Sequence, residues 1–431
     1  METQQIKKII LFVTFDHGGA GEYIYKIAGI LRNLGHQVVL VVKEKTKKED
    51  FILEIKTNPK KKTSIFSKII EKTNKKKYKI KLDDKYHFYG KDEATINVSP
   101  EKVFEQIGFI PDYIFAGWTA GFLNSTDILL LQQFSKAKVF TVTVDMNHFT
   151  GGCHYAWDCN GYVNGCTDNC PAILNPYFKD LAQTNFEFKL KNAQIGKFEI
   201  IAGSAWTLKQ AEQSKIYKNQ EKIININSLI DTNIMRPLGK KEAKDFFNLD
   251  LEKFYILMGC QNGNELRKGF DYLLESLKIL YNQLEIDTRN KINVILVSNK
   301  PILAQDQIPF NTTNLEYIKD YNKLSLLYQA VDVFVNSSIE DSGPMMVSEA
   351  LACGTPVVGF DMGVVSNMVI TGYNGYKAVL KDSQDLAKGI NEIFNLTQEQ
   401  YNTYSKNAVI QIQKYSSLEY ASNLLETLLR E

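Results

Sequence analysis

Short apolar runs alternate along the chain with glycine-bearing turns and with stretches whose apolar residues recur at helical spacing. The first run, Lys8–Phe15, predicts a buried strand. After a glycine turn, the next apolar positions predict a helix: Ile24, Ile27, Ala28, Leu31 and Leu34. A second apolar run follows at Gln37–Val42. Strand, turn, helix and strand in this order are typical of the start of a doubly wound parallel sheet.

The same alternation continues along the chain, and further strands are predicted at Pro111–Ala116, Lys138–Val144, Ile200–Ala202, Phe254–Gly259, Lys291–Asn299 and Leu315–Ile318. A chain of 431 residues is long enough for two domains of ordinary size. We expect a first Rossmann-like domain at residues 1–195 and a second at residues 196–414. The strand at Ile200–Ala202 is expected to open the second domain, and an amphipathic helix is expected within residues 415–431.

The composition is typical of a globular protein, with 44% hydrophobic and 23% charged residues and a formal net charge of +2. This charge gives no overall preference for nucleic acid or for membranes. The apolar run near the N-terminus is too short to span a membrane, and no small-residue cleavage site follows it. We therefore expect a cytoplasmic protein.

The stretch from Val331 to Lys377 carries the most chemistry. A strand-like run is followed by the acidic pair Glu340 and Asp341, and a helical pattern containing Glu349 comes next. This order predicts a βαβ unit, and parallel sheets bind ligands at the carboxyl ends of their strands. The N–H groups that open the helix can receive an anion or hydroxyl oxygens. A carboxylate at Glu349 can accept two adjacent hydroxyls of a ribose.

These residues resemble a region of the retaining glycosyltransferases of family 4. The family's E-x7-E motif is matched by Asp341 and Glu349, which have seven residues between them, and EALACGTPVVGF and TGYNGY fit closely. The resemblance covers nearly the whole chain. It implies the GT-B fold, in which two doubly wound Rossmann-like α/β domains face a central cleft. In that fold the C-terminal helix commonly packs back on the first domain.

The resemblance also implies the roles of individual residues. Arg267 and Lys268, in the loop QNGNELRKG, would neutralise the donor diphosphate, to which Arg can bind bidentately. The first acidic role falls to Asp341 or, with a one-residue insertion, to Glu340. The ribose would be held by Glu349. The sugar and phosphate would be held by the segment Ser342, Gly343, Pro344, Met345 and Met346. In this fold, basic side chains and helix N-termini replace a catalytic metal.

A glycine loop, His17–Gly21, directly follows the first predicted strand. It is not a dinucleotide fingerprint, because the spacing G-x-G-x-x-G is absent. It resembles the loop with which family 4 enzymes open, in which Gly18 and Gly19 would face the donor diphosphate and the acceptor. A structural turn alone would also explain these glycines.

Two positions depart from the family's pattern. Many relatives carry a His where Val144 stands, so a donor-contacting group is missing here, and His148 is the candidate substitute. The family's Pro-Asn-Gly loop is replaced by Asn227-Ser228-Leu229.

Lysines gather between Lys43 and Lys81, where fifteen Lys stand against five acidic residues and apolar residues lie among them. A basic amphipathic segment of this kind binds anionic membrane surfaces, so one prediction is peripheral attachment to the inner face of the cytoplasmic membrane. The other is a solvated segment with no partner. No aromatic platform or recognised motif accompanies the lysines, which argues against nucleic acid.

Four cysteines lie within eighteen residues: Cys153, Cys159, Cys166 and Cys170. Without a secretion signal, disulfides are disfavoured. Four thiols with His148 and His154 beside them can hold a tetrahedral zinc, although the spacing is not that of common zinc sites. Reduced structural thiols and a catalytic thiol are the alternatives. The remaining cysteines, Cys260 and Cys353, lie in apolar runs and are expected in the core.

The resemblance implies a retaining hexosyltransferase that uses a nucleotide-diphosphate sugar as donor. Its acceptor would be a hydroxyl of a glycan or lipid-linked molecule in capsule, exopolysaccharide or O-antigen-like biosynthesis. Two alternatives stay open at this point. One is a GT-B epimerase or phosphorylase, and the other is a catalytically silent protein that binds nucleotide sugars.

Overall fold

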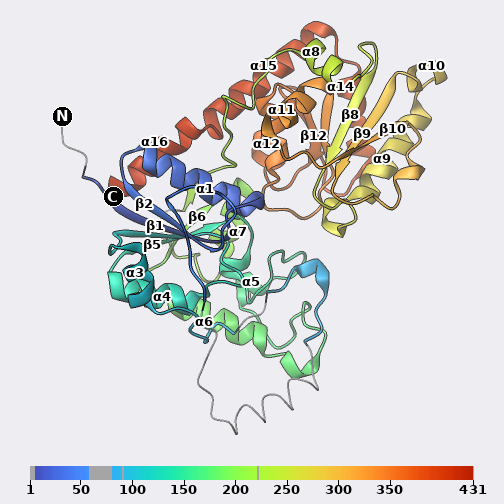
Figure 1. The fold of residues 1–431 in the computed structure, drawn as a ribbon. Coiled ribbons are helices and arrows are strands. Elements are labelled where there is room, and N and C mark those ends of the chain that lie inside the picture. The colour runs from blue at the N-terminus through green and yellow to red at the C-terminus, as the bar shows by residue number, and fades with distance from the viewer. Residues whose placement is uncertain (1–4, 58–79, 90–91, 221–222, 431) are drawn as a thin grey trace. The chain divides into compact units, whose positions relative to one another are not determined.

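The computed structural model describes residues 5–57, 80–89, 92–220 and 223–430. By their internal contacts, the residues form two compact units, Met1–Gly203 with Thr207–Asn225 and Ser204–Trp206 with Ile226–Glu431. Each unit is built on its own parallel sheet (Figure 1). The two doubly wound α/β sheets expected from the hydrophobic pattern are therefore confirmed.

Within the described residues, the first sheet has seven strands in the order β3-β2-β1-β4-β5-β6-β7. Its strands are β1 (Lys8–Phe15), β2 (Gln37–Glu44), β3 (Ile52–Glu54), β4 (Tyr113–Ala116), β5 (Lys138–Thr143), β6 (Glu199–Ala202) and β7 (Ile224–Asn225). The central strand, β1, is buried along almost its whole length. Both faces of a parallel sheet are covered by helices, which explains why this strand is uniformly apolar and does not alternate.

The described α-helices of the first unit are α1 (Gly18–Asn33), α3 (Pro100–Ile107), α4 (Ser125–Ser135), α5 (Gly161–Asn164), α6 (Leu181–Gly196) and α7 (Ala205–Gln213). Figure 1 shows α1 on one side of the sheet and α3, α4 and α6 on the other. The start of α4 is fixed by a capping box, in which Asn124 and Asp127 each bond the other's backbone N–H.

The strand at Glu199–Ala202 corrects one prediction. It was expected to open the second domain, but β6 pairs in parallel with β5 through Thr141↔Ile200 and Thr143↔Ala202. The preceding helix, α6, is the crossover between these two neighbouring strands. Strand and helix alternate without interruption through this region, so the hydrophobic pattern does not show where one sheet ends and the next begins.

The second sheet has six strands in the order β10-β9-β8-β11-β12-β13 within the described part of the chain. They are β8 (Phe254–Gly259), β9 (Ile292–Ser298), β10 (Asn311–Glu316), β11 (Val333–Asn336), β12 (Val357–Phe360) and β13 (Gly375–Ala378). All recorded pairings are parallel. The central strands β8 and β11 adjoin each other, so the loops that follow them meet at one edge of the sheet.

The helices of the second unit are α8 (Lys240–Phe246), α9 (Phe270–Gln283), α10 (Ile286–Arg289), α11 (Tyr321–Ala330), α12 (Met345–Ala352), α13 (Val365–Met368), α14 (Ser383–Phe394), α15 (Gln398–Tyr415) and α16 (Leu418–Arg430). The core on one face of the sheet joins residues of α11, α12 and α15 to β8, β9, β11 and β12. On the other face, α9 packs against α14. The predicted packing of the terminal helix, α16, on the first domain stays a prediction.

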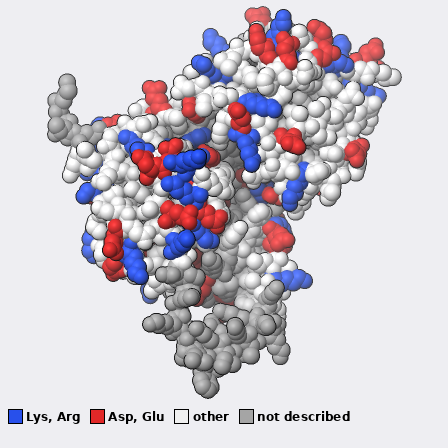
Figure 2. Space-filling model, in the orientation of Figure 1, with Lys and Arg blue, Asp and Glu red and all other residues white. Residues whose placement is uncertain are grey.

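Charge is distributed without a dominant sign on the face drawn in Figure 2, where Lys and Arg side chains lie among Asp and Glu. This mixture agrees with the formal net charge of +2. Among the described helices, none combines the length and the apolar character needed to cross a bilayer. The apolar residues predicted to form a membrane-binding face, within the segment Lys43–Lys81, lie outside the described residues.

Candidate active site

The loop after β8 is bonded by its backbone to the loop after β11. The carbonyl of Arg267 accepts the N–H of Ile339 at 2.8 Å, and the carbonyl of Lys268 accepts the hydroxyl of Ser337 at 2.9 Å. Gly269 permits this close approach, because its φ is +62° and a Cβ there would lie 2.0 Å from the carbonyl oxygen of Ser337. The backbone thus places the two predicted cations directly beside the predicted acidic loop.

A compact charge cluster results. The carboxylate oxygen Oδ2 of Asp341 lies 2.8 Å from Nη1 of Arg267 and 2.6 Å from Nζ of Lys268. On its other side, Arg267 pairs through Nε with Glu265 at 2.8 Å. Two cations therefore face two carboxylates. Glu265 was not predicted as part of this group, and nothing in its sequence position distinguishes it from other loop carboxylates.

The acidity of Asp341 follows from this cluster. Burial alone would raise the pKa of the Asp341 carboxyl, but Lys268 and Arg267 beside it outweigh burial, and the pKa falls to about 2. The N–H of Gly343 also donates to this carboxylate. Asp341 is thus a permanent anion at neutral pH. Glu340 is buried to a similar extent, at 9% exposure against 8% for Asp341, and its N–H lies 3.3 Å from the carbonyl of Arg267.

Glu349 lies on α12, whose first residue, Met345, follows this loop. Pro344 precedes the helix and contributes no side-chain cap, so the opening N–H groups have no partner from that side chain. Glu349 is only 5% exposed, and its Oε2 accepts the hydroxyl of Tyr328 from α11 at 2.9 Å. Tyr328 was not predicted as a site residue, and it lies 21 positions away in the sequence.

The predicted site residues of the second unit thus come together at one edge of its sheet: Arg267, Lys268, Glu340, Asp341, Ser342, Gly343, Pro344, Met345, Met346 and Glu349. Met346 closes the end of β8, because a Cβ added at Gly259 would lie 2.3 Å from its terminal methyl carbon. The segment Asn227-Ser228-Leu229, which replaces the family's Pro-Asn-Gly loop, is held by packing and by a hydrogen bond. Leu229 is fully buried, and the side chain of Asn227 donates to the carbonyl of Tyr415 at 3.1 Å.

Gly18 and Gly19 belong to the first unit, where they begin α1. Both are exposed, and a Cβ added at either would meet nothing within 4 Å. The position that requires glycine for steric reasons is Gly21, where a Cβ would lie 2.4 Å from the carbonyl oxygen of Phe15. Gly21 therefore serves helix–strand packing, while Gly18 and Gly19 leave open space at the carboxyl end of β1.

His148, the candidate substitute for the missing His, is buried in the first unit. Its Nε2 donates to the carbonyl oxygen of Gly117 at 2.8 Å. Burial, followed by the charge of Lys189, lowers the pKa of His148 to about 4, so the imidazole is neutral at physiological pH. Nδ1 of a nearby imidazole, that of His154, lies 2.7 Å from Oδ2 of Asp145 and 3.0 Å from the indole nitrogen of Trp118.

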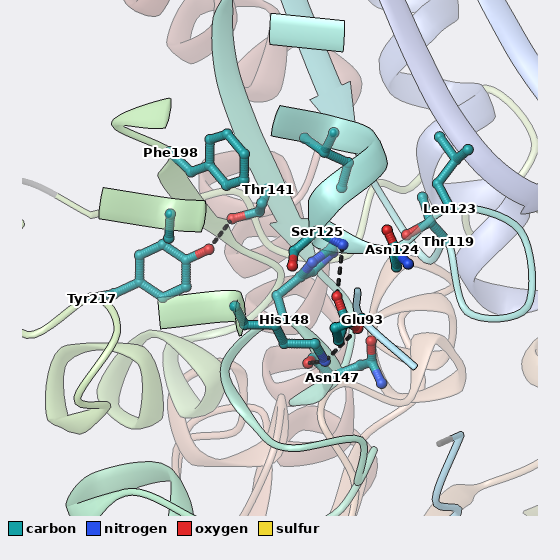
Figure 3. Close-up of a pocket in the computed structure, with 13 residues that line it drawn as sticks. Glu93, Thr119, Leu123, Asn124, Ser125, Thr141, Asn147, His148, Phe198 and Tyr217 are labelled. Atoms are coloured by element: carbon teal, nitrogen blue, oxygen red, sulfur yellow. Dashed lines mark hydrogen bonds and ion pairs between the residues drawn. The ribbon is translucent and has the colours of Figure 1, made fainter. Parts of the chain in front are cut away.

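His148 helps to line a small polar pocket that lies entirely within the first unit (Figure 3). The polar groups of its walls bond to one another. Thr141 and Tyr217 share a hydrogen bond of 2.9 Å, and the N–H of Ser125 donates to Glu93 at 2.8 Å. The ammonium of Lys189 donates to the carbonyl of Asn147 at 2.6 Å. These bonds tie the loop after β5 to α6 and the start of α4 to Glu93, so we assign the pocket to the framework of the domain.

The four clustered cysteines are free thiols around an apolar cluster that includes Tyr86, Phe88 and Ala182. Within the described residues, no group of three or more His, Cys, Asp or Glu side chains is arranged to hold a metal ion. A hydrogen bond from the thiol of Cys153 lowers the pKa of Cys170 to about 7. Cys260 and Cys353 are buried, as predicted.

Comparison with known proteins agrees with this architecture. Residues 240–410 match the family model described as "Glycosyl transferases group 1", and this range contains the whole cluster around Asp341 and Glu349. This part of the chain, residues 240–410, is therefore similar to the group 1 glycosyltransferases.

Two relatives and one solved structure illustrate the likeness. An uncharacterized glycosyltransferase of Haemophilus influenzae is 24% identical over 240 residues, which cover 52% of this chain and 62% of the relative. An N,N'-diacetylbacillosaminyl-diphospho-undecaprenol alpha-1,3-N-acetylgalactosaminyltransferase of Campylobacter jejuni is 26% identical over 191 residues, 43% of this chain and 46% of the relative. The matched stretches thus span less than two thirds of either relative.

HepE of Anabaena in complex with UDP-glucose is 15% identical, with a TM-score of 0.63 over 99% of this chain and 100% of that chain. A likeness at this identity shows the fold, which is GT-B, as predicted.

Proposed function

We propose that this chain is a retaining hexosyltransferase that moves a sugar from a nucleotide-diphosphate sugar to a hydroxyl of a glycan or lipid-linked acceptor. The observation that carries the proposal is the convergence of Arg267, Lys268, Asp341 and Glu349 at the carboxyl ends of β8 and β11. Anionic and polyhydroxyl ligands bind at this edge of parallel sheets.

Each group has a chemical task in the proposed reaction. The bond from the anomeric carbon to the diphosphate oxygen breaks, and Arg267 and Lys268 stabilise the charge that builds on that oxygen. The acceptor hydroxyl forms the new bond on the face that the leaving group vacates, and its proton passes to a phosphate oxygen. Asp341, or Glu340 beside it, orients the sugar, while Glu349 accepts the ribose hydroxyls.

The ion pairs of Asp341 affect how the donor diphosphate can bind. In the structure, both cations are already paired with Asp341. A diphosphate that binds them must share or replace this carboxylate, and opposite charges about 4 Å apart interact by roughly 4 kcal/mol at an effective dielectric of 20. Donor binding is therefore an exchange of partners for Lys268 and Arg267, and it is sensitive to salt.

The nature of the donor and acceptor is supported by similar proteins. The solved HepE complex contains UDP-glucose, and the name of the Campylobacter relative describes an undecaprenol-linked substrate. The proposed donor is accordingly a nucleotide-diphosphate sugar, and the acceptor is lipid-linked or a glycan in surface polysaccharide synthesis. Gly18 and Gly19, where an added Cβ would meet nothing within 4 Å, are further proposed contacts of the substrates.

A thermal-shift panel of nucleotide sugars tests the proposal. A ligand that binds only the folded state raises the melting temperature in proportion to the logarithm of its excess over Kd. We expect at least one nucleotide sugar to raise it in the presence of a chelator, because no metal ion has a role in the proposed reaction. If no nucleotide sugar shifts the melting temperature, the proposed function is wrong.

A further inference from the structure

Tyr328 is the buried neighbour of Glu349. Its side chain is wholly inaccessible, and its hydroxyl donates to Oε2 of Glu349 at 2.9 Å. The ring meets Phe334 of β11 edge-on, with centroids 5.9 Å apart. Its carbonyl accepts the hydroxyl of Thr355, which follows α12, at 2.6 Å. Tyr328 is therefore fixed by the strand and by the helix between which it lies.

The hydrogen bond from Tyr328 uses one acceptor position of the Glu349 carboxylate. An ionised carboxylate has about four acceptor positions on its two oxygens, and a tyrosine hydroxyl fills one of them. A glutamate side chain has three rotatable bonds, so an unsupported carboxylate samples several orientations. A donor held between β11 and α12 restricts Glu349 to one of them.

We infer that Tyr328 is a positioning residue for the ribose of the donor, acting through Glu349. The inference rests on the proposed function, in which Glu349 accepts the ribose hydroxyls. Tyr328 does not itself touch the donor. By holding Oε2, it sets the plane in which the carboxylate meets two adjacent hydroxyls, and it reduces the conformational freedom that donor binding would otherwise remove.

The hydroxyl remains a donor over the whole working range of pH. Burial, followed by the charge of Glu349, raises the pKa of Tyr328 well above its ordinary value. The proton thus stays on the tyrosine and in the hydrogen bond. This agrees with a permanent positioning role.

The hydrogen bond from Tyr328 to Glu349 could serve only to hold the helices together, or it could position the carboxylate for the ribose. In the structural case, loss of the hydroxyl disturbs α11 and α12 and weakens every ligand equally. In the positioning case, the loss is felt only by ligands that carry the ribose hydroxyls. The two cases therefore differ in a measurement made with two nucleotides.

The experiment compares the wild-type chain with Tyr328→Phe by titration calorimetry, using UDP and 2′,3′-dideoxy-UDP. We expect Tyr328→Phe to weaken the binding of UDP by about tenfold or more, as loss of one hydrogen bond to a charged group implies. The affinity for the dideoxy nucleotide should differ by less than about twofold between Tyr328→Phe and wild type. A matched control is Tyr376→Phe, since Tyr376 also donates to a carboxylate of the same unit, that of Asp385, at 2.6 Å. This control should leave both affinities unchanged.

Every outcome bears on the inference. Equal weakening of both nucleotides by Tyr328→Phe, or no weakening of either, overturns it. If wild-type protein binds none of UDP, GDP, ADP and CDP, the proposed function fails together with the inference; if one of the other three binds, it and its dideoxy form replace the UDP pair. If Tyr328→Phe does not fold, 3,5-difluorotyrosine at position 328 keeps the shape and strengthens the donor. It should then alter the affinity for the ribonucleotide alone, and an unchanged affinity overturns the inference.

Discussion

The ammonium of Lys268 lies 2.6 Å from Oδ2 of Asp341, although 73 positions separate the two residues in the chain. This contact is possible because β8 and β11 are neighbours, so the loops that follow them share one edge of the sheet. It joins the predicted phosphate-binding group to the predicted sugar-orienting group. The contact also means that the cation has a partner before any donor arrives.

Removing the cation should abolish most of the activity. We expect Lys268→Ala to lower kcat/KM by about a hundredfold or more, which is typical when one group that stabilises developing charge is lost. Steady-state kinetics with the donor identified by thermal shift provide the measurement. Lys253→Ala is the matched control, since Lys253 precedes β8 at the opposite edge of the sheet and donates to the carbonyl of Asn290. Near-normal rates for Lys268→Ala would show that the site is wrongly assigned.

Neutralising the competing carboxylate should separate binding from turnover. In Asp341→Asn, Arg267 and Lys268 no longer share their charge with an anion, so we expect a nucleoside diphosphate to bind about tenfold more tightly. Turnover should fall, because the group that orients the sugar is lost. Calorimetry with UDP and steady-state rates measure the two effects. Weaker binding of UDP to Asp341→Asn would contradict the exchange of partners.

The same carboxyl gives a signature in the pH dependence of stability. The pKa of Asp341 is about 2 in the folded protein, against 3.8 for the ordinary group. A lowered pKa stabilises the folded state above the ordinary value, and this stabilisation is lost as the pH falls from about 4 towards 2. The loss is on the order of 2 kcal/mol. Denaturant unfolding between these pH values should show a smaller decline for Asp341→Asn than for wild type, and parallel curves would refute the assignment.

Two glycines of the first unit should differ in their tolerance of a side chain. Gly21→Ala places a Cβ 2.4 Å from the carbonyl of Phe15, whereas Gly19→Ala meets nothing within 4 Å. We expect Gly21→Ala to destabilise the protein by roughly 2 kcal/mol, which is typical of an overpacked core, and Gly19→Ala to leave the melting temperature nearly unchanged. Gly19→Ala should instead lower kcat/KM, if the loop faces the substrates. Comparable melting temperatures for both variants would contradict the packing role of Gly21.

The cysteine cluster should react unevenly with alkylating agents. The hydrogen bond from the thiol of Cys153 lowers the pKa of Cys170 to about 7, whereas burial raises the pKa of Cys166 to about 12. The thiolate is the nucleophile, so iodoacetamide near pH 7.5 should modify Cys170 first. Peptide mass mapping over time measures the order. Earlier labelling of Cys166 would show that the thiols are arranged differently.

Much of the fold was predictable from the hydrophobic pattern. The strands at Lys8–Phe15 and Phe254–Gly259 have the predicted bounds, because each is a buried apolar run closed by a turn. The assignment of Glu199–Ala202 failed for a physical reason. A strand's own residues show that it is buried, whereas its sheet is decided by pairing with a distant strand, here β5.

The site was predictable as a set of residues but not as a set of contacts. Arg267, Lys268, Asp341 and Glu349 were identified from a motif and from their places after predicted strands. The bond from Tyr328 to Glu349 arises from the packing of α11 against α12, and no spacing rule links these positions. The same holds for His148, which burial and the charge of Lys189 keep neutral against the opposing effect of its hydrogen bond to Gly117.

The most direct test of the central claim is the anomeric configuration of the product. Wild-type protein is incubated with the nucleotide sugar that raises its melting temperature and with lipid-linked and glycan acceptors, and the new glycosidic bond is examined by NMR. We predict that nucleoside diphosphate is released in step with transfer and that the product keeps the donor's anomeric configuration. An inverted product, or release of the diphosphate with no new glycosidic bond under any acceptor, would contradict the account.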